Sequence, residues 1–226
     1  MSGIGRLAFA LALCGAPAAA CNLALVLALD ISSSVDAAED AIQRQGLARA
    51  LLSPDVQRAF LDSAPVALYA FEWSGQETQV PLTPGWIMVA GPDDLALAAS
   101  AIGASVRSRD DLPTALGRAL GHAATLLRDG PDCARSTIDV SGDGENNESF
   151  DPDHVYASFP FDGVTVNALI IAGQNDDLEL ISYFRERVVY GPGAFSLAIR
   201  GFDDYQPAME AKLIRELRLP ALSALQ

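Results

Sequence analysis

The sequence is poor in basic residues, in histidine and in cysteine. Its 226 residues contain 15 Lys and Arg against 29 Asp and Glu, which gives a formal net charge of -14 at pH 7. Nucleic acids and anionic membrane surfaces bind proteins through Lys and Arg, so this balance argues against both as partners. Two His and three Cys, with no CxxC pair, exclude a zinc knuckle and a disulfide-dense scaffold. A surface this acidic suits cations, or partners that are bound through a metal ion.

Residues 1–20 have the three-part layout of a secretory signal peptide. Arg6 precedes an apolar run over residues 7–13, and small residues then lead up to Cys21. This layout predicts cleavage after Ala20 and a periplasmic or secreted protein. The apolar run is shorter than the ~20 residues of a membrane-spanning helix, so we expect no membrane insertion after cleavage.

A lipoprotein signal is the alternative interpretation, because Cys21 would be the first residue of the mature chain. Ala18 stands where lipoprotein signals usually carry leucine, which favours cleavage without lipidation. The mature chain then keeps two cysteines, Cys21 and Cys133, an even number in an oxidising compartment. We expect residues 21–226 to form a single domain, because they contain no internal repeat, linker or charge block.

Strand-like and helix-like segments alternate along the mature chain. Residues 22–30, NLALVLALD, form an unbroken apolar run, which is typical of a strand buried on both faces. We expect further strands at 65–75, at 78–82 or 85–89, and at 136–141, 164–172 and 194–200. We expect helices at 37–52, 54–61, 93–102, 114–128, 153–158, 178–188 and 207–217. This alternation predicts an α/β fold of the Rossmann-like, doubly wound kind, with a mostly parallel sheet and helices on both faces.

Oxygen-bearing side chains gather where the predicted strands end. Asp30, Ser32 and Ser34 follow the first strand in a D-x-S-x-S pattern. Thr114 starts a helix after a charged loop, and Asp143 lies between two glycines after a later strand. Doubly wound sheets bind ligands beyond the carboxyl ends of their strands. Two carboxylates and three hydroxyls form an all-oxygen ligand set, which suits Mg²⁺.

Each of these residues also has an ordinary structural explanation. Residues 32–34, helped by Asp36, would suffice to cap the helix that follows. Thr114 is a natural N-cap residue, and Asp143 is a common kind of turn residue. The combination of five such side chains on three strand-end loops favours a metal site over coincidence.

This constellation resembles the metal-ion-dependent adhesion site (MIDAS) of von Willebrand factor A (vWA) domains. The resemblance covers essentially the whole mature chain, because the order of elements and the spacing of the motifs agree with that fold. It implies a six-stranded sheet in the order 3-2-1-4-5-6 and a bound Mg²⁺, with Mn²⁺ or Ca²⁺ as alternatives. The implied metal ligands are Asp30, Ser32, Ser34, Thr114 and Asp143.

Finer features resemble an uncharacterised proteobacterial branch of exported vWA-like proteins. These features are VSGDGENN at 140–147, GPGAF at 191–195 and the cysteine pair. Pro113, before the threonine, departs from the more flexible residue of many vWA domains and stiffens that loop. Asn146 and Asn147 are expected to be solvated loop residues.

The vWA strand order also implies a disulfide between Cys21 and Cys133. Each cysteine immediately precedes a strand, and in that order the two strands are parallel neighbours. Their amino ends then lie about 4.8 Å apart, a separation that a disulfide can span.

The strand at 136–141 contains a carboxylate that needs a partner. Ile138 and Val140 are expected on one face of the sheet, and Thr137 and Asp139 on the other. A carboxylate inside a buried strand requires a hydrogen bond or an opposite charge. The sequence names no firm candidate for it.

The resemblance implies a binding protein, in which the ion binds a carboxylate of a protein partner. The alternative is a Mg²⁺-dependent hydrolase or phosphotransferase that uses Asp30. Haloacid-dehalogenase-type enzymes carry a second Asp two residues later, where this chain has Ser32. The sequence contains no P-loop and no G-x-S-x-G motif, and neither His122 nor His154 lies in a predicted strand-end loop. We therefore expect no enzyme.

Overall fold

The computed structural model describes residues 21–173 and 177–218, so the expected signal peptide lies outside the described residues. The strands are β1 (Leu23–Asp30), β2 (Val66–Trp73), β3 (Gln79–Pro81), β4 (Ile87–Val89), β5 (Ser136–Gly142), β6 (Val164–Ile171) and β7 (Ser196–Ile199). The α-helices are α1 (Ala37–Leu52), α2 (Pro54–Asp62), α3 (Pro92–Ala104), α4 (Leu116–Asp129), α5 (Pro152–Ser158), α6 (Leu178–Tyr183) and α7 (Tyr205–Arg218). A π-helical turn, η1 (Phe184–Val188), continues α6, and a 3-10 turn, η2 (Phe202–Asp204), precedes α7. Among the described residues, no helix has both the length and the apolar character required to cross a membrane.

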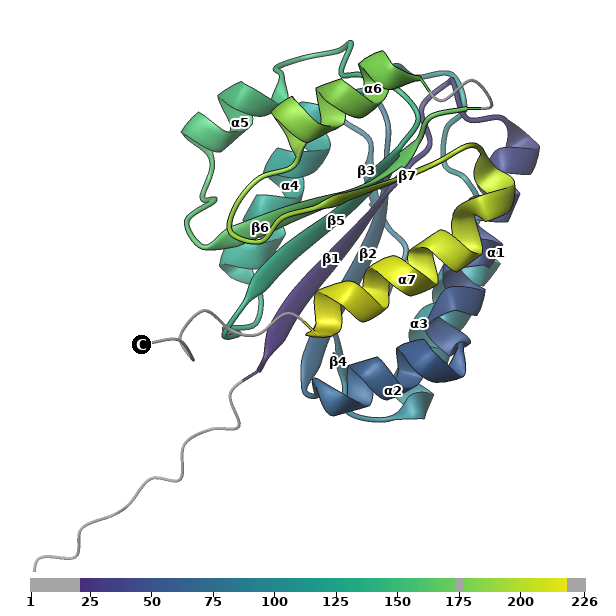
Figure 1. The fold of residues 1–226 in the computed structure, drawn as a ribbon, viewed down its shortest axis with the longest axis vertical. Coiled ribbons are helices and arrows are strands. Elements are labelled where there is room, and N and C mark those ends of the chain that lie inside the picture. The colour runs from purple at the N-terminus through teal and green to yellow at the C-terminus, as the bar shows by residue number, and fades with distance from the viewer. Residues whose placement is uncertain (1–20, 174–176, 219–226) are drawn as a thin grey trace, which may run out of the picture.

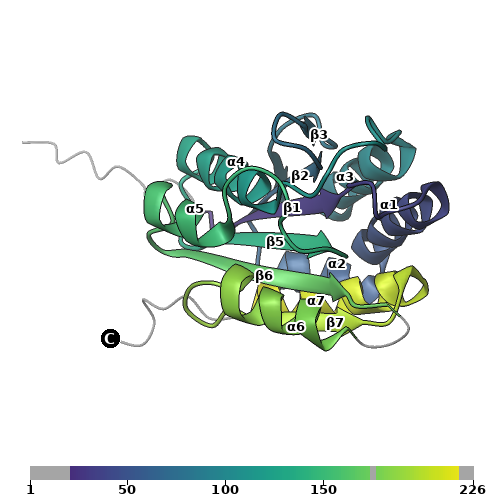
Figure 2. The same cartoon turned by 90° about the horizontal axis from the view of Figure 1, so that it is seen from above.

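The strands form one sheet in the order β3-β2-β1-β5-β6-β7 (Figures 1 and 2). This is the order 3-2-1-4-5-6 that the vWA resemblance implies, with one further strand, β4. The two segments treated as alternatives in the sequence, 78–82 and 85–89, both contain a strand. Both form because β2 is long enough to pair with β4 along residues 66–68 and with β3 along residues 71–73. These two strands are antiparallel to β2, whereas the other pairs are parallel.

Helices cover both faces of the sheet, because β1 has apolar side chains on each face that must be buried. Leu25 and Leu27 pack among α1, α2, α3 and α7, on the right of Figure 1. Val26 and Ala28 pack among α4, α5, α6 and η1, on the left. The unbroken apolar run that predicted a doubly buried strand therefore has a core on each side.

The predicted disulfide between Cys21 and Cys133 is present. The two Cα atoms are 4.3 Å apart, and the residues form a parallel bridge just before β1 and β5. These strands are direct neighbours with Ala24 opposite Ser136, so the sheet itself brings the cysteines together.

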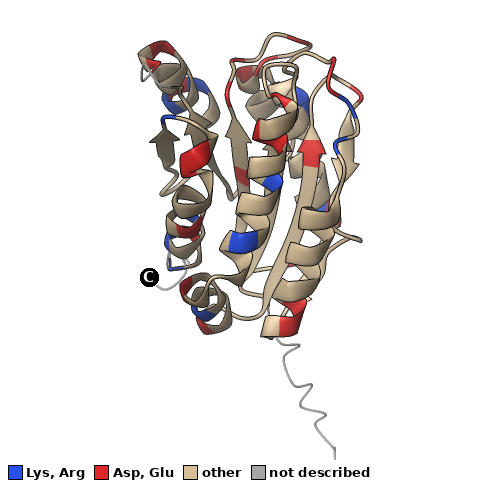
Figure 3. Cartoon of the chain, turned by 90° about the vertical axis from the view of Figure 1, so that its right-hand side faces the viewer, with Lys and Arg blue, Asp and Glu red and all other residues tan. Residues whose placement is uncertain are grey.

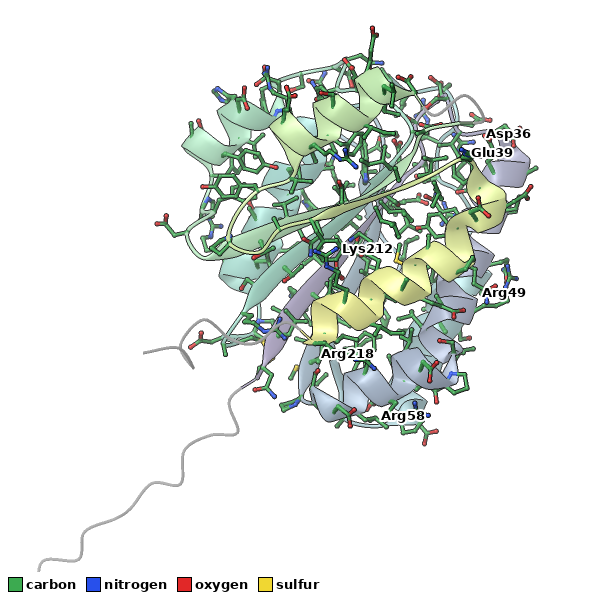
Figure 4. All side chains as sticks on the ribbon, viewed as in Figure 1. Asp36, Glu39, Arg49, Arg58, Lys212 and Arg218 are labelled. Carbon is green, nitrogen blue, oxygen red and sulfur yellow. A yellow bond between two sulfur atoms is a disulfide. The ribbon has the colours of Figure 1, made fainter. Side chains whose placement is uncertain are left out.

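Asp139 is buried on β5, and its partner comes from the last helix. As predicted, Ile138 and Val140 face the core under α4, while Asp139 faces α7. Lys212 of α7 points toward the sheet (Figure 4). Its Nζ lies 2.5 Å from Asp139 Oδ1, and the two groups form an ion pair whose geometry is not that of a hydrogen bond. Lys212 also donates a hydrogen bond of 2.7 Å to Glu216 Oε1. One cation thus serves two buried carboxylates.

Candidate metal centre

The predicted ligands lie at the carboxyl end of the sheet. Asp30 ends β1, and Ser32 and Ser34 lie in the loop between β1 and α1. Asp143 follows β5, and Thr114 lies two residues before α4. Because β1 and β5 are adjacent parallel strands, the loops that follow them meet at the same edge.

Short contacts connect four of these residues. The Ser32 backbone N–H donates to Asp30 Oδ1 at 2.7 Å, and the Oγ atoms of Ser32 and Ser34 are 3.1 Å apart. The Ser34 hydroxyl donates to Asp143 Oδ1 at 2.6 Å. Thr114 lies beside this chain of contacts, since a Cβ added at Gly144 would be 3.5 Å from its Oγ1. The structure therefore brings all five residues to one place.

The serines do not cap the helix that follows them. Asp36 is the N-cap of α1, and its Oδ1 accepts hydrogen bonds from the N–H groups of Ala38 and Glu39 at 2.7 and 2.9 Å. Glu39 completes a capping box, because its Oε2 accepts from the Asp36 N–H at 2.8 Å. Capping of α1, the ordinary structural explanation for Ser32 and Ser34, is thus performed by Asp36.

Thr114 does not cap a helix either, and the prediction that α4 begins at Thr114 is wrong. The helix begins at Leu116, with Ala115 as an N-cap that has no capping side chain. Asn147 holds Thr114 in place: its Oδ1 accepts from the Thr114 N–H at 2.8 Å, and its own N–H donates to the Thr114 carbonyl at 2.9 Å. These paired bonds fix the backbone at Thr114 and direct its hydroxyl independently of the helix.

Asn146 and Asn147 lie in a loop as predicted, with Asn147 exposed and Asn146 half-buried, but their side chains also hold backbone groups around the site, a role that the prediction missed. Asn146 Oδ1 accepts from the Gly117 N–H in the first turn of α4 at 3.0 Å, and the Asn146 N–H donates to the Tyr183 hydroxyl at 3.2 Å. Asparagine side chains commonly satisfy free backbone groups in loops and at helix starts. The sequence pattern that could have indicated this role is the pair of consecutive asparagines after a buried strand.

Asp30 is buried, Asp143 is half-buried, and the two carboxylates are close enough for their charges to interact. Burial raises the pKa of Asp30 to about 7, and the neighbouring charge of Asp143 adds to this rise. Burial also raises the pKa of Asp143, the Ser34 hydrogen bond opposes this rise, and Glu39 adds to it. Sequence reasoning did not single out Glu39, which lies in the first turn of α1 (labelled in Figure 4) and lines the same pocket as Asp143.

One oxygen of Asp30 has no protein partner. Its Oδ2 is buried without a hydrogen bond, whereas Oδ1 accepts from Ser32. A Cβ added at Gly142 would lie only 3.1 Å from this oxygen, so glycine leaves the space beside it open. A divalent cation would neutralise both carboxylates and satisfy the buried oxygen.

A metal ion bound here needs hydroxyl oxygens as ligands in addition to the two carboxylates. Within residues 21–173 and 177–218, no group of three or more His, Cys, Asp or Glu side chains could hold a metal. A site here must combine the two carboxylates with Ser and Thr oxygens, which is hard-ligand chemistry suited to Mg²⁺. Figure 3 shows further acidic positions at the end of the molecule where the strands finish.

The loop between α3 and α4 supports the loop that carries the serines. Arg107 Nη2 donates to the carbonyls of residues 31 and 32 at 2.8 and 2.9 Å. The adjacent Ser108 N–H donates to Glu72 Oε1 at 3.0 Å. Glu72 in turn forms a buried ion pair with Arg44 of α1. A buried charge cluster thus holds the segment that positions Arg107.

Solved structures of vWA type resemble the chain over most of its length. Proximal thread matrix protein 1 from the mussel byssus, described with a zinc-occupied MIDAS motif, is 18% identical with a TM-score of 0.59. That match covers 88% of this chain and 48% of the mussel protein, so this chain spans about half of its length. The von Willebrand factor type A protein from Catenulispora acidiphila is 15% identical with a TM-score of 0.61, and the match covers 88% of this chain and 43% of that protein.

A third structure, the PilB minor pilin of Streptococcus sanguinis, is 11% identical with a TM-score of 0.63 over 88% of this chain and 62% of that one. At these identities the likeness shows the fold, which is the vWA fold. No curated protein matches the sequence. The family described as "Protein of unknown function (DUF1194)" matches residues 20–221, nearly the whole chain. The chain therefore belongs to the DUF1194 family and has a von Willebrand factor A fold.

Proposed function

We propose that this protein binds a divalent cation and uses it to bind a carboxylate of a protein partner. The proposed ligands are Asp30, Ser32, Ser34, Thr114 and Asp143. The observation that carries the proposal is the buried Oδ2 of Asp30, which has no hydrogen-bond partner and faces the space left by Gly142. Buried carboxylate oxygens are costly unless they are paired or coordinate a metal.

The ligand set supports a role in binding a partner. Three of the five side chains are hydroxyls, which coordinate a metal without adding charge. A divalent ion held with Asp30 and Asp143 therefore stays attractive to a further carboxylate at an open position. All-oxygen ligands favour Mg²⁺, with Mn²⁺ or Ca²⁺ as alternatives. The mussel neighbour, described with a zinc-occupied MIDAS motif, supports a divalent ion in general terms.

We propose no catalytic role for the site. His122 lies on α4 and packs edge-on against Phe71, 5.0 Å between ring centroids. His154 lies on α5 beside Phe150. Neither histidine is placed to act as a base for Asp30 or the serines, and Ser32 cannot replace the second Asp of a haloacid-dehalogenase-type site.

We also propose that the protein is exported to the periplasm or secreted. The support is the signal-like sequence of residues 1–20 together with the disulfide of the described chain, since disulfides persist in oxidising compartments. The disulfide occupies the Cys21 thiol that a lipid would require, which favours cleavage without lipidation.

Calorimetric titration of the purified protein with Mg²⁺, Mn²⁺ and Ca²⁺ tests the metal site directly. Trp73 supplies a second measurement, because its Cζ2 lies 3.7 Å from a Cβ added at Gly142, beside the site. The chain has two tryptophans, so a Trp86→Phe variant leaves Trp73 as the single tryptophan. We expect saturable binding of one ion per chain and a change in Trp73 fluorescence that EDTA reverses. No binding of any of the three ions would refute the proposal.

The partner is then sought by affinity capture from a periplasmic extract, in parallel with Mg²⁺ and with EDTA. Proteins that depend on the metal should be captured by the native protein and lost with Asp30→Asn. A Ser33→Ala variant is the matched control, because Ser33 lies in the same loop but is exposed.

A further inference from the structure

A groove of about 460 Å³ opens beside the metal centre. Its walls come from α1, the ends of β6 and β7, and the starts of α6 and η2. Asp143 lines this groove and also accepts the hydrogen bond from Ser34 within the metal centre. The groove and the metal centre are therefore continuous, and a partner bound at the ion would extend into the groove.

The floor and the rim of the groove differ in chemistry. Ile171, Leu180 and Phe202 line it and are 5–6% exposed, so they form an apolar floor. Asp177 and Asp203 line it as exposed residues and form an acidic rim. An apolar floor with an anionic rim matches a side chain that has an aliphatic stem and a cationic end.

The described residues that line the groove carry more negative than positive charge. Among them, Glu39, Asp177 and Asp203 contribute three carboxylates besides Asp143, and Arg200 is the one basic residue. Arg200 already takes part in an interaction within the protein. The carboxylates also have only partial roles in the fold: one oxygen of Asp177 caps α6, and one oxygen of Glu39 caps α1. The groove therefore attracts a cation from outside the chain.

We infer that the groove receives a lysine or arginine side chain from the same partner segment whose carboxylate binds the metal ion. This inference rests on the proposed function and defines the partner chemically, as a segment with an acidic and a basic residue close together. It also explains how a protein of net charge -14 can bind an acidic side chain. The basic residue offsets the long-range repulsion between partner and surface.

A displayed peptide library tests the inference without knowledge of the natural partner. Each peptide carries one fixed central aspartate among random residues, is selected on the Mg²⁺-loaded protein and is eluted with EDTA. We expect Lys or Arg to be enriched within a few positions of the aspartate. Selected peptides should bind the native protein roughly tenfold more tightly than their versions with Gln in place of the basic residue, a difference of about 1.4 kcal/mol.

Two variants locate the effect. Asp203→Asn removes a rim charge and should abolish the roughly tenfold preference for the basic residue. Asp62→Asn removes an exposed charge from the last residue of α2, the helix that carries Arg58 at the bottom of Figure 4, and should change nothing. The inference is overturned if no basic residue is enriched, or if Asp203→Asn keeps the preference.

Calorimetry with Mg²⁺ alone on the same samples separates this inference from the proposed function. Intact Mg²⁺ binding without a preference for basic peptides would overturn the groove assignment and leave the metal site standing. Absence of Mg²⁺ binding would overturn the proposed function and the inference with it.

Discussion

The Ser34 hydroxyl donates a hydrogen bond of 2.6 Å to Asp143 Oδ1 across 109 positions of the sequence. This contact joins the loop after β1 to the loop after β5. It exists because β1 and β5 are neighbouring parallel strands that run side by side to the same edge of the sheet. The two motifs that the sequence analysis assigned to one site are therefore in direct contact.

Asp30→Asn should abolish Mg²⁺ binding and leave the fold intact. The amide keeps the shape of the side chain but loses the charge that a cation requires. In EDTA, at neutral pH and above, the variant should be at least as stable as the native protein, because burial disfavours the ionised carboxylate. Calorimetry and thermal unfolding measure the two effects. Ser33→Ala should resemble the native protein in both, and wild-type Mg²⁺ affinity of Asp30→Asn would contradict the assigned ligand.

Gly142→Ala should weaken Mg²⁺ binding at least tenfold. The added Cβ would lie 3.1 Å from Asp30 Oδ2 and 3.4 Å from the Phe184 ring, so it would occupy the space beside the unpartnered oxygen. Gly144→Ala is the matched control, because its Cβ would meet Thr114 Oγ1 at an ordinary 3.5 Å. Titration with Mg²⁺ measures the affinity of both variants. Equal affinities of Gly142→Ala and Gly144→Ala would mean that the ion does not occupy the space beside Gly142.

The strands and helices whose bounds depend on the local sequence pattern could be predicted from the sequence. The first strand was predicted because its apolar residues are buried on both faces, and α1 has its predicted bounds of 37–52 because Asp36 caps it and Ser53 ends it. The five proposed metal ligands lie together as the vWA resemblance implied. The bound metal ion and the partner stay predictions.

The features that sequence reasoning missed depend on contacts between distant segments. The α4 helix starts at Leu116 because Asn147 fixes the backbone at Thr114 from 33 positions away. The partner of Asp139 is Lys212, on a helix at the other end of the chain. No local pattern indicates which lysine will face a given carboxylate, so the ion pair could not be predicted.

Arg107→Met should lower Mg²⁺ affinity several-fold with little loss of stability. The Arg107 guanidinium holds the carbonyls of residues 31 and 32, and so positions the loop that carries the serines. Methionine keeps the aliphatic volume and removes both hydrogen bonds. Arg109→Met is the control, since Arg109 is exposed and pairs with Asp111 nearby. Unchanged Mg²⁺ affinity of Arg107→Met, measured by calorimetry, would show that the loop keeps its shape without Arg107.

The last prediction concerns Glu216, in the buried cluster around Lys212. Burial raises the pKa of Glu216 to about 7, and the charge of Asp139 adds to the rise while Lys212 opposes it. Of its two oxygens, Oε1 accepts from Lys212 and Asn167, and Oε2 is buried without a partner. With one ammonium for two carboxylates, the protonated form of Glu216 is favoured in the folded protein.

A raised pKa in the folded state means that this group stabilises the fold at low pH and that its contribution is lost as pH rises through about 7. Glu216→Gln keeps the accepting Oε1 and cannot ionise, so it should lack this loss. Thermal unfolding should show the variant and the native protein nearly equal at about pH 4, below the ordinary pKa of the group, with the variant more stable at about pH 8 by on the order of 1–3 kcal/mol. The raised pKa of Asp30 acts in the same direction in both proteins, so it cancels in the difference. Glu210→Gln, on the same helix but only partly buried, should show no such divergence, and parallel pH profiles for Glu216→Gln and the native protein would mean that Glu216 titrates normally in the fold.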